Sequence, residues 1–177
     1  MGKMSIGLKR GTVKVVDYDL NWPKEFNAEK QRLLAAFDDK VLAIKHIGST
    51  SIPGLAAKPI IDIVAAVASF DDLPEFIDGL QKLGYEYMPE RMFNDRKFFP
   101  KGSQEKRTHH LNLVLRDNLE QWTKPIAFRD YLRTHEIERN EYAKLKTELA
   151  EQYADDRATY TKLKDDFFQS IFDKALS

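Results

Sequence analysis

The sequence has 177 residues, of which 42% are hydrophobic and 32% charged, and its formal net charge at pH 7 is zero. This length and composition favour one domain, 1–177, whose core needs no disulfide or metal to fold, and they exclude a disordered chain. The absence of cysteine excludes thiolate nucleophiles and cysteine-bound metals.

The same composition bounds the partners and the compartment. Lys plus Arg and Asp plus Glu each total 28, and the lack of a basic run argues against nucleic acid as a partner. The longest apolar stretch, residues 60–70, is interrupted by Asp62 and is too short to span a membrane. The first residues contain no apolar segment typical of a secretory leader. We therefore expect a cytoplasmic protein that does not enter the membrane.

The predicted elements begin with a helix and two strands. Asn21 followed by Trp22-Pro23 is typical of a helix entry, and apolar residues at helical spacing extend the predicted helix to about residue 38. A strand is predicted at 41–47. After a polar turn, the nearly continuous apolar run 59–67 predicts a central strand covered on both faces.

The rest of the chain predicts one more helix, three strands and a helical final third. The next helix follows Asp72 and ends at Gly84, where glycine permits a helix stop. The expected fold class is α/β (α+β), with a mixed β-sheet packed with helices over about 12–116 and a helical C-terminal part over about 117–177. The remaining strands are predicted at 85–88, 97–100 and 108–115, and the final helices at 118–133, 136–153 and 156–175.

Residues 46–62, HIGSTSIPGLAAKPIID, carry the strongest indication of chemistry. Gly48, Ser49 and Thr50 follow a strand, where glycine permits close backbone approach and the hydroxyl and N–H groups donate hydrogen bonds to phosphate. The spacing differs from that of a P-loop and from that of a hydrolase nucleophile elbow. We therefore predict a phosphate cradle at these three residues, with a turn that only caps the strand as the alternative. His46 is interpreted as a structural residue that orients this loop through its ring.

Asp62 lies inside the predicted central strand, where a carboxylate without a partner is costly. A Gly-Ser turn followed by an Asp in a buried strand resembles the opening of the nucleotidyltransferase superfamily. The resemblance implies that Gly-Ser binds nucleotide phosphates and that Asp62 is a catalytic residue and a ligand of Mg²⁺. From the residues alone, an Asp62 paired with Lys58 or an arginine to fix the core stays an alternative.

The whole chain resembles the GrpB family, bacterial proteins with a nucleotidyltransferase-like fold. The resemblance covers nearly the full length, so it implies a single GrpB-like domain. The matching pieces are Trp22-Pro23, HIGSTSIPGLAAKPIIDI at 46–63, LGY at 83–85, Arg91, HHLNLV at 109–114, FRDYLR at 128–133, YAKLK at 142–146 and YTKLK at 160–164.

Two positions depart from the pattern of active transferases. Val64, two residues after Asp62, stands on the strand face where the second metal carboxylate of active transferases lies. In the late strand, Asn112 occupies a position at which many family members carry a second histidine. His110 shares a face with Asn112, so we expect His110 to lie beside Asp62 as a second catalytic residue and His109 to face the other side of the sheet.

Four basic residues are expected to neutralise the charge of a bound phosphate: Lys58, Arg129, Lys146 and Lys164. Lys146 and Lys164 each stand four residues after a tyrosine, so they share a helical face with it and are expected to converge on an anion. The alternatives are that both lysines extend to solvent and that Arg129 forms a surface ion pair with Asp130. A basic-aromatic patch, interpreted as a base-stacking surface or a strand edge, consists of Arg91, Arg96, Phe98 and Phe99.

These features predict a nucleotide- or phosphometabolite-binding protein, with Mg²⁺-dependent nucleotidyl transfer to an unidentified acceptor as its activity. The alternative is a catalytically silent module that kept the phosphate cradle and lost the second metal carboxylate, and Val64 favours it. RNA binding, a third hypothesis, is weakened by the zero net charge. The expected partner is a nucleotide or another phosphorylated small molecule.

Overall fold

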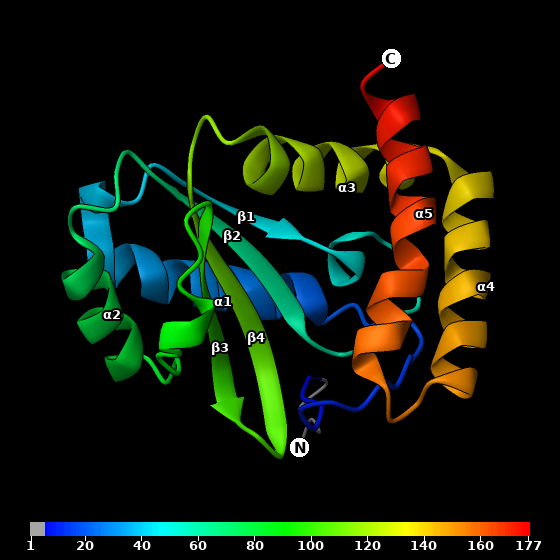
Figure 1. The fold of residues 1–177 in the computed structure, drawn as a ribbon, viewed down its shortest axis with the longest axis horizontal. Coiled ribbons are helices and arrows are strands. Elements are labelled where there is room, and N and C mark those ends of the chain that lie inside the picture. Colours follow the sequence, from blue (N-terminus) through cyan, green and yellow to red (C-terminus); the bar gives the residue numbers. More distant parts are fainter. Residues whose placement is uncertain (1–5) are drawn as a thin grey trace.

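A four-stranded mixed sheet lies at the centre of the structure, a computed structural model that describes residues 6–177 (Figure 1). The strand order is β1-β2-β4-β3; β1 and β3 run antiparallel to their neighbours, whereas β2 and β4 are parallel. The two central strands are therefore a parallel pair, as expected for strands that are covered on both faces. The strands are β1 (Ala43–Ile47), β2 (Ile61–Val67), β3 (Arg96–Ser103) and β4 (Lys106–Leu115).

Helices cover the sheet from both sides. Side chains alternate along β2, so Ile61 and Ile63 face a core shared with α1 and α2, whereas Asp62 and Val64 point to the opposite face. The helices are α1 (Trp22–Phe37), α2 (Leu73–Lys82), α3 (Lys124–Thr134), α4 (Glu136–Gln152) and α5 (Arg157–Ala175). Short turns are η1 (Asp38–Lys40), η2 (Ser49–Ser51), η3 (Pro89–Arg91) and the π-helical η4 (Leu119–Thr123).

The C-terminal helices pack on the loop between β1 and β2 rather than on the sheet alone. Ile52 and Leu55 of that loop are buried in a cluster with Phe128 of α3, Tyr142 of α4 and Phe172 of α5. This cluster holds α4 and α5 side by side at one end of the sheet (Figure 1). Within the described part of the chain, none of the helices is long and apolar enough to cross a membrane.

The segment before α1 joins the sheet region to the helical region. The N–H of Gly7 donates to the carbonyl of Pro59 at 2.7 Å, ahead of β2, and Leu8 forms a bridge with Arg107 of β4. Farther along, the N–H of Val13 donates at 2.7 Å to the carbonyl of Ala154, between α4 and α5. One extended segment thus contacts both parts of the domain.

The expected fold class, a mixed sheet packed with helices and followed by a helical C-terminal third, is confirmed. The helix and strand boundaries agree with the predicted ones to within a few residues, with one exception: the strand predicted at 85–88 is wrong. Only Tyr85 pairs there, as an isolated bridge with Lys101, and Pro89 then opens the turn η3. Proline has no N–H to continue a strand ladder. Residues 1–5, part of the segment expected to lack a leader, lie outside the described residues.

The buried carboxylate of Glu29 holds α1 to the face of the sheet opposite Asp62. The Glu29 side chain is fully buried and accepts hydrogen bonds from Lys101 (2.8 and 2.9 Å), Arg32 (2.8 Å) and the Tyr85 hydroxyl (2.8 Å). Burial alone would raise the pKa of Glu29, but the hydrogen bonds and charges of these partners outweigh it and lower the pKa. Glu29 therefore stays ionised at neutral pH.

Replacing Glu29 with Gln should lower the free energy of unfolding by about 3 kcal/mol, because Lys101 loses its charged partner in a buried site. Chemical denaturation at pH 7 measures this loss. The control is Glu25→Gln, a change on the same helix outside this cluster. Equal stability of the two variants would contradict the structural role of Glu29.

Candidate functional site

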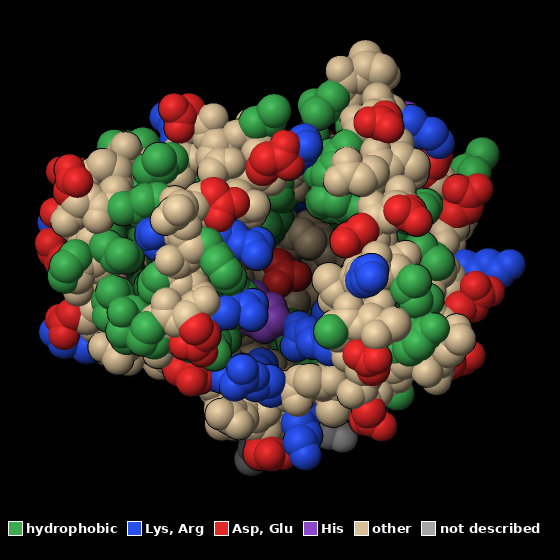
Figure 2. All heavy atoms as spheres, in the orientation of Figure 1, with side chains coloured by type: hydrophobic (Ala, Val, Ile, Leu, Met, Phe, Trp, Pro, Cys, Tyr) green, Lys and Arg blue, Asp and Glu red, His purple; other side chains and the backbone are tan. Residues whose placement is uncertain are grey.

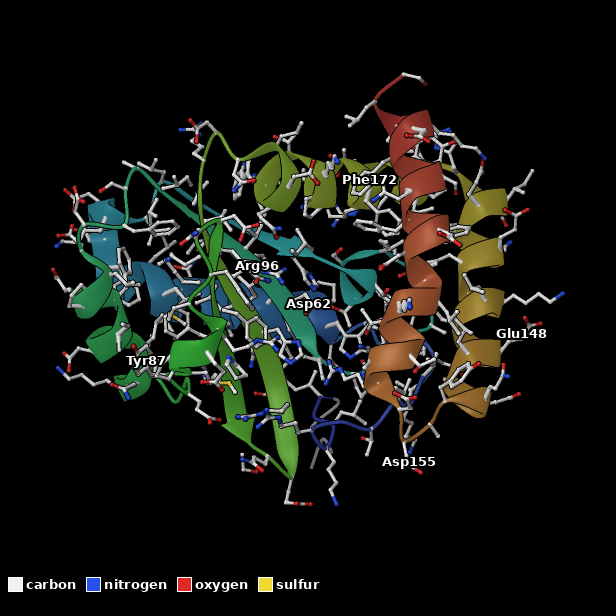
Figure 3. All side chains as sticks on the ribbon, viewed as in Figure 1. Asp62, Tyr87, Arg96, Glu148, Asp155 and Phe172 are labelled. Atoms are coloured by element: carbon white, nitrogen blue, oxygen red, sulfur yellow. The ribbon has the colours of Figure 1, made fainter. Side chains whose placement is uncertain are left out.

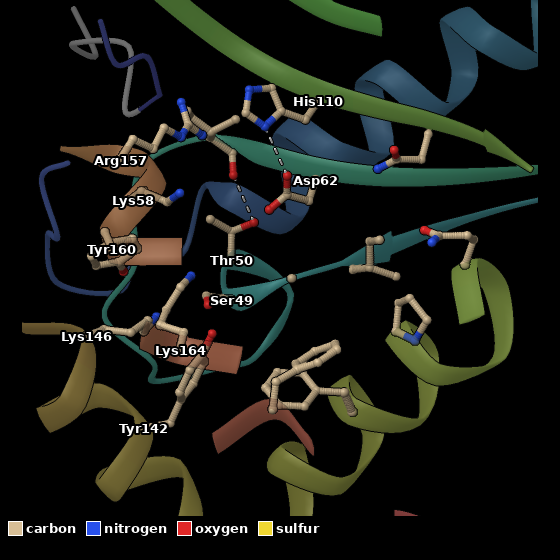
Figure 4. Close-up of a pocket in the computed structure, with 18 of the residues that line it drawn as sticks. Ser49, Thr50, Lys58, Asp62, His110, Tyr142, Lys146, Arg157, Tyr160 and Lys164 are labelled. Atoms are coloured by element: carbon tan, nitrogen blue, oxygen red, sulfur yellow. Dashed lines mark hydrogen bonds and ion pairs between the residues drawn. The ribbon is translucent and has the colours of Figure 1, made fainter. Parts of the chain in front are cut away.

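A pocket of about 380 Å³ opens between the sheet and the C-terminal helices, on the face of β2 that carries Asp62 (Figure 4). Seen from outside, it is a hollow near the middle of one face, with Lys and Arg side chains and some Asp and Glu side chains at its rim (Figure 2). We call it the lysine pocket. From the sheet and its loops, the walls include Gly48, Ser49 and Thr50 after β1, Lys58 just before β2, Asp62 in β2, and His110 and Asn112 in β4. From the helices, they include Tyr142 and Lys146 of α4 and Arg157, Tyr160 and Lys164 of α5.

Gly48 begins the loop in a conformation that only glycine adopts readily, with φ +72° and ψ −175°. A Cβ at this position would lie 2.5 Å from Oδ2 of Asp62. The chain therefore brings its backbone directly against the carboxylate. The η2 turn follows at once, so Ser49 and Thr50 lie at the pocket wall next to Asp62.

His46 fixes this loop from below. Its Nε2 lies 2.9 Å from the hydroxyl of Thr50, which in turn donates to the carbonyl of Ile60 at 3.4 Å. Burial lowers the pKa of His46 to about 4, so the ring is neutral and its Nε2 shares a hydrogen bond with the Thr50 hydroxyl. The interpretation of His46 as a residue that orients the loop agrees with this geometry.

Asp62 and His110 face each other across the parallel pair, because Asp62 is in register with His110. Oδ1 of Asp62 lies 3.4 Å from Nδ1 of His110 (Figure 4). Burial alone would raise the pKa of Asp62, but the hydrogen bond to His110 and the charges of Lys58 and Arg157 lower it overall. Burial lowers the pKa of His110 more than Asp62 raises it. The pair is therefore an ionised carboxylate beside a neutral imidazole, and His109, one residue earlier, faces Glu29 instead.

Three lysines converge on the lysine pocket from different elements. Burial first, and repulsion from Lys164 and Arg157 second, lower the pKa of Lys58 to about 7. Lys146 is 1% exposed and its Nζ donates to the carbonyl of Ala56; burial and the charges of Lys164 and Lys58 lower its pKa well below the usual range. The expectation that Lys146 and Lys164 converge agrees with the structure, and extension of Lys146 to solvent does not.

Arg157, which the sequence reasoning did not single out, also reaches the lysine pocket. It begins α5 and lies three residues before Tyr160 and seven before Lys164, so all three share one face of the helix. Helical spacing from the Tyr160 motif was the available signal. Lys164 lies 4.5 Å from the centre of the Tyr160 ring, and Lys58 lies 5.3 Å from it on the other side of the pocket.

Arg129 does not join the lysine pocket. Its guanidinium donates to the backbone carbonyl of His46 at 2.9 Å and pairs with Asp130 at 2.8 Å. Its neighbour Arg133 makes a similar backbone contact, to the carbonyl of Ser51 at 2.7 Å. The structure corrects the expected role of Arg129, because α3 uses this face to hold the outer side of the loop. The ion pair with Asp130, the alternative stated above, is present.

Known proteins resemble this chain over most of its length. A family model described as GrpB protein matches residues 12–174. YqkA of Bacillus subtilis is 38% identical over 163 residues, which are 92% of this chain and 47% of YqkA, so the chain spans about half the length of this relative. The glutamate-rich protein GrpB of Alkalihalophilus pseudofirmus is 34% identical over 173 residues, 96% of this chain and 99% of that protein. A crystal structure of the conserved protein GrpB from Enterococcus faecalis has a TM-score of 0.85 and 36% identity, covering 92% of this chain and 97% of that chain.

A comparison of Gly48 with Gly54 separates the energetic cost of a positive φ from the cost of the contact with Asp62. Gly48 and Gly54 both have positive φ, +72° and +81°, but a Cβ at Gly54 meets nothing within 4 Å. Gly54→Ala should therefore cost about 1 kcal/mol of unfolding free energy from backbone strain alone. Gly48→Ala should cost at least about 2 kcal/mol, because Asp62 must also move.

Chemical denaturation of the two variants measures these costs side by side. Chemical shifts of the His110 ring give a second measurement, since they should move in Gly48→Ala and stay unchanged in Gly54→Ala. Equal costs and an unmoved His110 in both variants would show that Gly48 does not hold Asp62 in place.

Proposed function

This chain belongs to the GrpB family, and we propose that its lysine pocket binds a phosphorylated small molecule, a nucleotide or a phosphometabolite, through the phosphate groups. The observation that carries the proposal is the excess of positive charge in the pocket. Lys58, Lys146, Lys164 and Arg157 line it together with Asp62, and the other carboxylate at its edge, Glu120, is paired with Lys124 at 2.5 Å. Glu148 and Asp155 lie at the outer edge of the molecule (Figure 3).

The lowered pKa values show what this arrangement costs without a ligand. Burial and mutual repulsion lower the pKa of Lys58 to about 7 and that of Lys146 well below its usual range. A polyanion removes the repulsion and brings the ammonium groups back to full protonation. Phosphate fits better than a single carboxylate, because several cations from different directions match its several oxygens.

Unused hydrogen-bonding groups at the pocket wall also favour a polar ligand. Within residues 6–177, the buried Tyr160 hydroxyl and the Oδ1 of Asn112 have no hydrogen-bond partner. The Ser49 hydroxyl, half-buried at the wall, also makes no hydrogen bond in that part of the chain. Buried polar groups without partners are costly, so groups of this kind at a pocket wall favour a ligand that satisfies them.

The donor set around Asp62 does not fit a Mg²⁺ ion held by the protein alone. Among the described residues, no group of three His, Asp or Glu side chains lies close enough together to hold a metal. Val64 packs in a buried apolar cluster with Ile47 and Val114 instead of supplying a second carboxylate. Lys58 and Arg157 place positive charge near Asp62, and this charge has the same sign as a metal ion and would repel it. The proposed binding therefore depends on the protein's own cations.

One observation favours nucleotidyl transfer as a second candidate function. Asp62 orients a neutral His110 at the wall of the pocket, and a neutral imidazole held by a carboxylate is suited to accept a proton. In this reaction the hydroxyl of an acceptor would transfer its proton to His110 as its oxygen bonds to the α-phosphorus of a nucleoside triphosphate. The bond to pyrophosphate breaks, and the lysines neutralise the leaving group.

Lys164→Gln should weaken binding of inorganic pyrophosphate about tenfold, because one charged hydrogen-bond donor is lost from the pocket. Lys164 is chosen because Lys146 also donates to the backbone of Ala56, so its loss would disturb the fold. Titration calorimetry in EDTA measures the affinity, and the loss should shrink as salt rises. The control is the exposed Lys162→Gln on the same helix. Equal affinities in the wild type and Lys164→Gln would remove the proposed function.

The Asp62→Asn variant tests whether the ligand is bound by the lysines alone or through a metal ion held by Asp62. If the lysines alone neutralise the ligand, the variant should bind pyrophosphate about threefold to tenfold more tightly, since a carboxylate that repels the anion is removed. Wild-type affinity should then not rise when Mg²⁺ replaces EDTA, because Mg²⁺ only competes with the protein for pyrophosphate in solution. Affinity that requires Mg²⁺ in the wild type and disappears in Asp62→Asn would instead establish Asp62 as a metal ligand. Calorimetric titrations of both proteins in both buffers decide between the two.

A further inference from the structure

A second pocket of about 290 Å³ adjoins the lysine pocket and shares two of its wall residues, His110 and Arg157. Its other walls come from the segment before α1, from η3 and from the β3–β4 pair. We call it the arginine pocket, because the cations around it are Arg10, Arg91, Arg107 and Arg157.

The charge of the arginine pocket is only partly neutralised by the protein. Arg107 is buried and committed to the fold: its guanidinium pairs with Glu86 at 2.5 Å and donates to the carbonyl of Gly102 at 2.6 Å. Arg10, Arg91 and Arg157 differ from it. Within residues 6–177, none of these three guanidinium groups forms an ion pair or a hydrogen bond. Three arginines that form no ion pair therefore face one cavity, and only the longer-range charges of Asp62 on Arg157 and of Glu90 on Arg91 offset them.

Arg91 is held in place at this wall by aromatic rings. Its guanidinium carbon lies 4.6 Å from the centre of the Phe98 ring and 5.7 Å from that of Phe93. The Nε of Arg91 is buried without a hydrogen-bond partner among the described residues. Stacking fixes the plane of the guanidinium while leaving its N–H groups unused. Of the basic-aromatic patch predicted from the sequence, Phe98 contacts Arg91 at the pocket, whereas Phe99 lies in the core on the other face of the sheet.

The Phe98 ring contacts both Arg91 and His110, the histidine that pairs with Asp62 in the lysine pocket. Its ring meets that of His110 edge to face, with centres 5.2 Å apart. His110 contacts Asp62 on one side and lines the arginine pocket on the other. The imidazole therefore stands at the boundary between two cationic cavities.

We propose that the arginine pocket is a second phosphate-binding site, so that phosphate groups are bound on both sides of His110. This inference rests on the proposed function, which assigns the first phosphate to the lysine pocket. A planar guanidinium donates two parallel hydrogen bonds to a phosphate, and several arginines without partners supply the charge that the group requires. In the transfer reaction, the second site would receive a phosphorylated acceptor and present its hydroxyl to His110.

Titration with inorganic pyrophosphate measures the number of phosphate-binding sites directly. In titration calorimetry with EDTA, wild-type protein should bind two equivalents. Arg91→Gln should weaken one of them about tenfold or more, by the loss of charged hydrogen bonds, and leave the other unchanged. Lys164→Gln should do the reverse. Arg10→Gln serves as a second variant of the arginine pocket that does not endanger the fold, because Arg10 is exposed. The exposed Arg116→Gln is the matched control.

The outcomes separate this inference from the proposed function. One equivalent that Lys164→Gln weakens and that neither Arg91→Gln nor Arg10→Gln changes would overturn the second site and leave the proposed function intact. One equivalent weakened by the arginine variants alone would overturn the proposed function and would place pyrophosphate in the arginine pocket, so that phosphate is not bound on both sides of His110. One equivalent weakened by both kinds of variant would show a single continuous site and overturn the inference. Absence of binding would overturn both.

Discussion

The parallel pairing of β2 with β4 sets Asp62 opposite His110, and the rest of the pocket is built around that register. A shift of one residue would turn Asp62 away from His110 and into the core that α1 and α2 share with the sheet, where burying another carboxylate is costly. The hydrophobic residues on either side of Asp62 therefore fix the position of the carboxylate. Gly48 then approaches it so closely that the loop after β1, the strand and the histidine form one unit.

The cations gather around this unit from parts of the chain that are far apart in sequence. Lys58 precedes β2, whereas Lys146 and Lys164 come from α4 and α5. The apolar cluster around Ile52 and Phe172 brings the helices to the loop, so the burial of that cluster provides the free energy that holds like charges together. Apolar packing therefore brings the cations together, and their mutual repulsion is a consequence of that packing. Arrangements of this kind, with several perturbed pKa values at one cleft, are typical of functional sites.

Local patterns predicted the site only in part. Alternation in 108–115 placed His110 on one face and His109 on the other, as observed, and the two Tyr-x-Lys-Leu-Lys motifs mark two lysines that both line the pocket. The strand predicted at 85–88 was wrong because Pro89 stops the ladder after the single bridge of Tyr85. The role expected for Arg129 was wrong because its guanidinium contacts the backbone of His46, 83 residues away. Such polar contacts depend on tertiary packing and leave no periodic signal in the sequence.

The bridge that the segment before α1 forms between the two regions has a consequence for how the chain folds during translation. Val13 leaves the ribosome early, yet its amide pairs with Ala154, which is synthesised about 140 residues later. The last strand ends at Leu115, but the Val13 amide lacks its partner until the turn after α4 emerges. Contacts of such long sequence separation slow folding, because the loop must close before they form. Pairing of Val13 with Ala154 is therefore a late step, which follows the synthesis of α4.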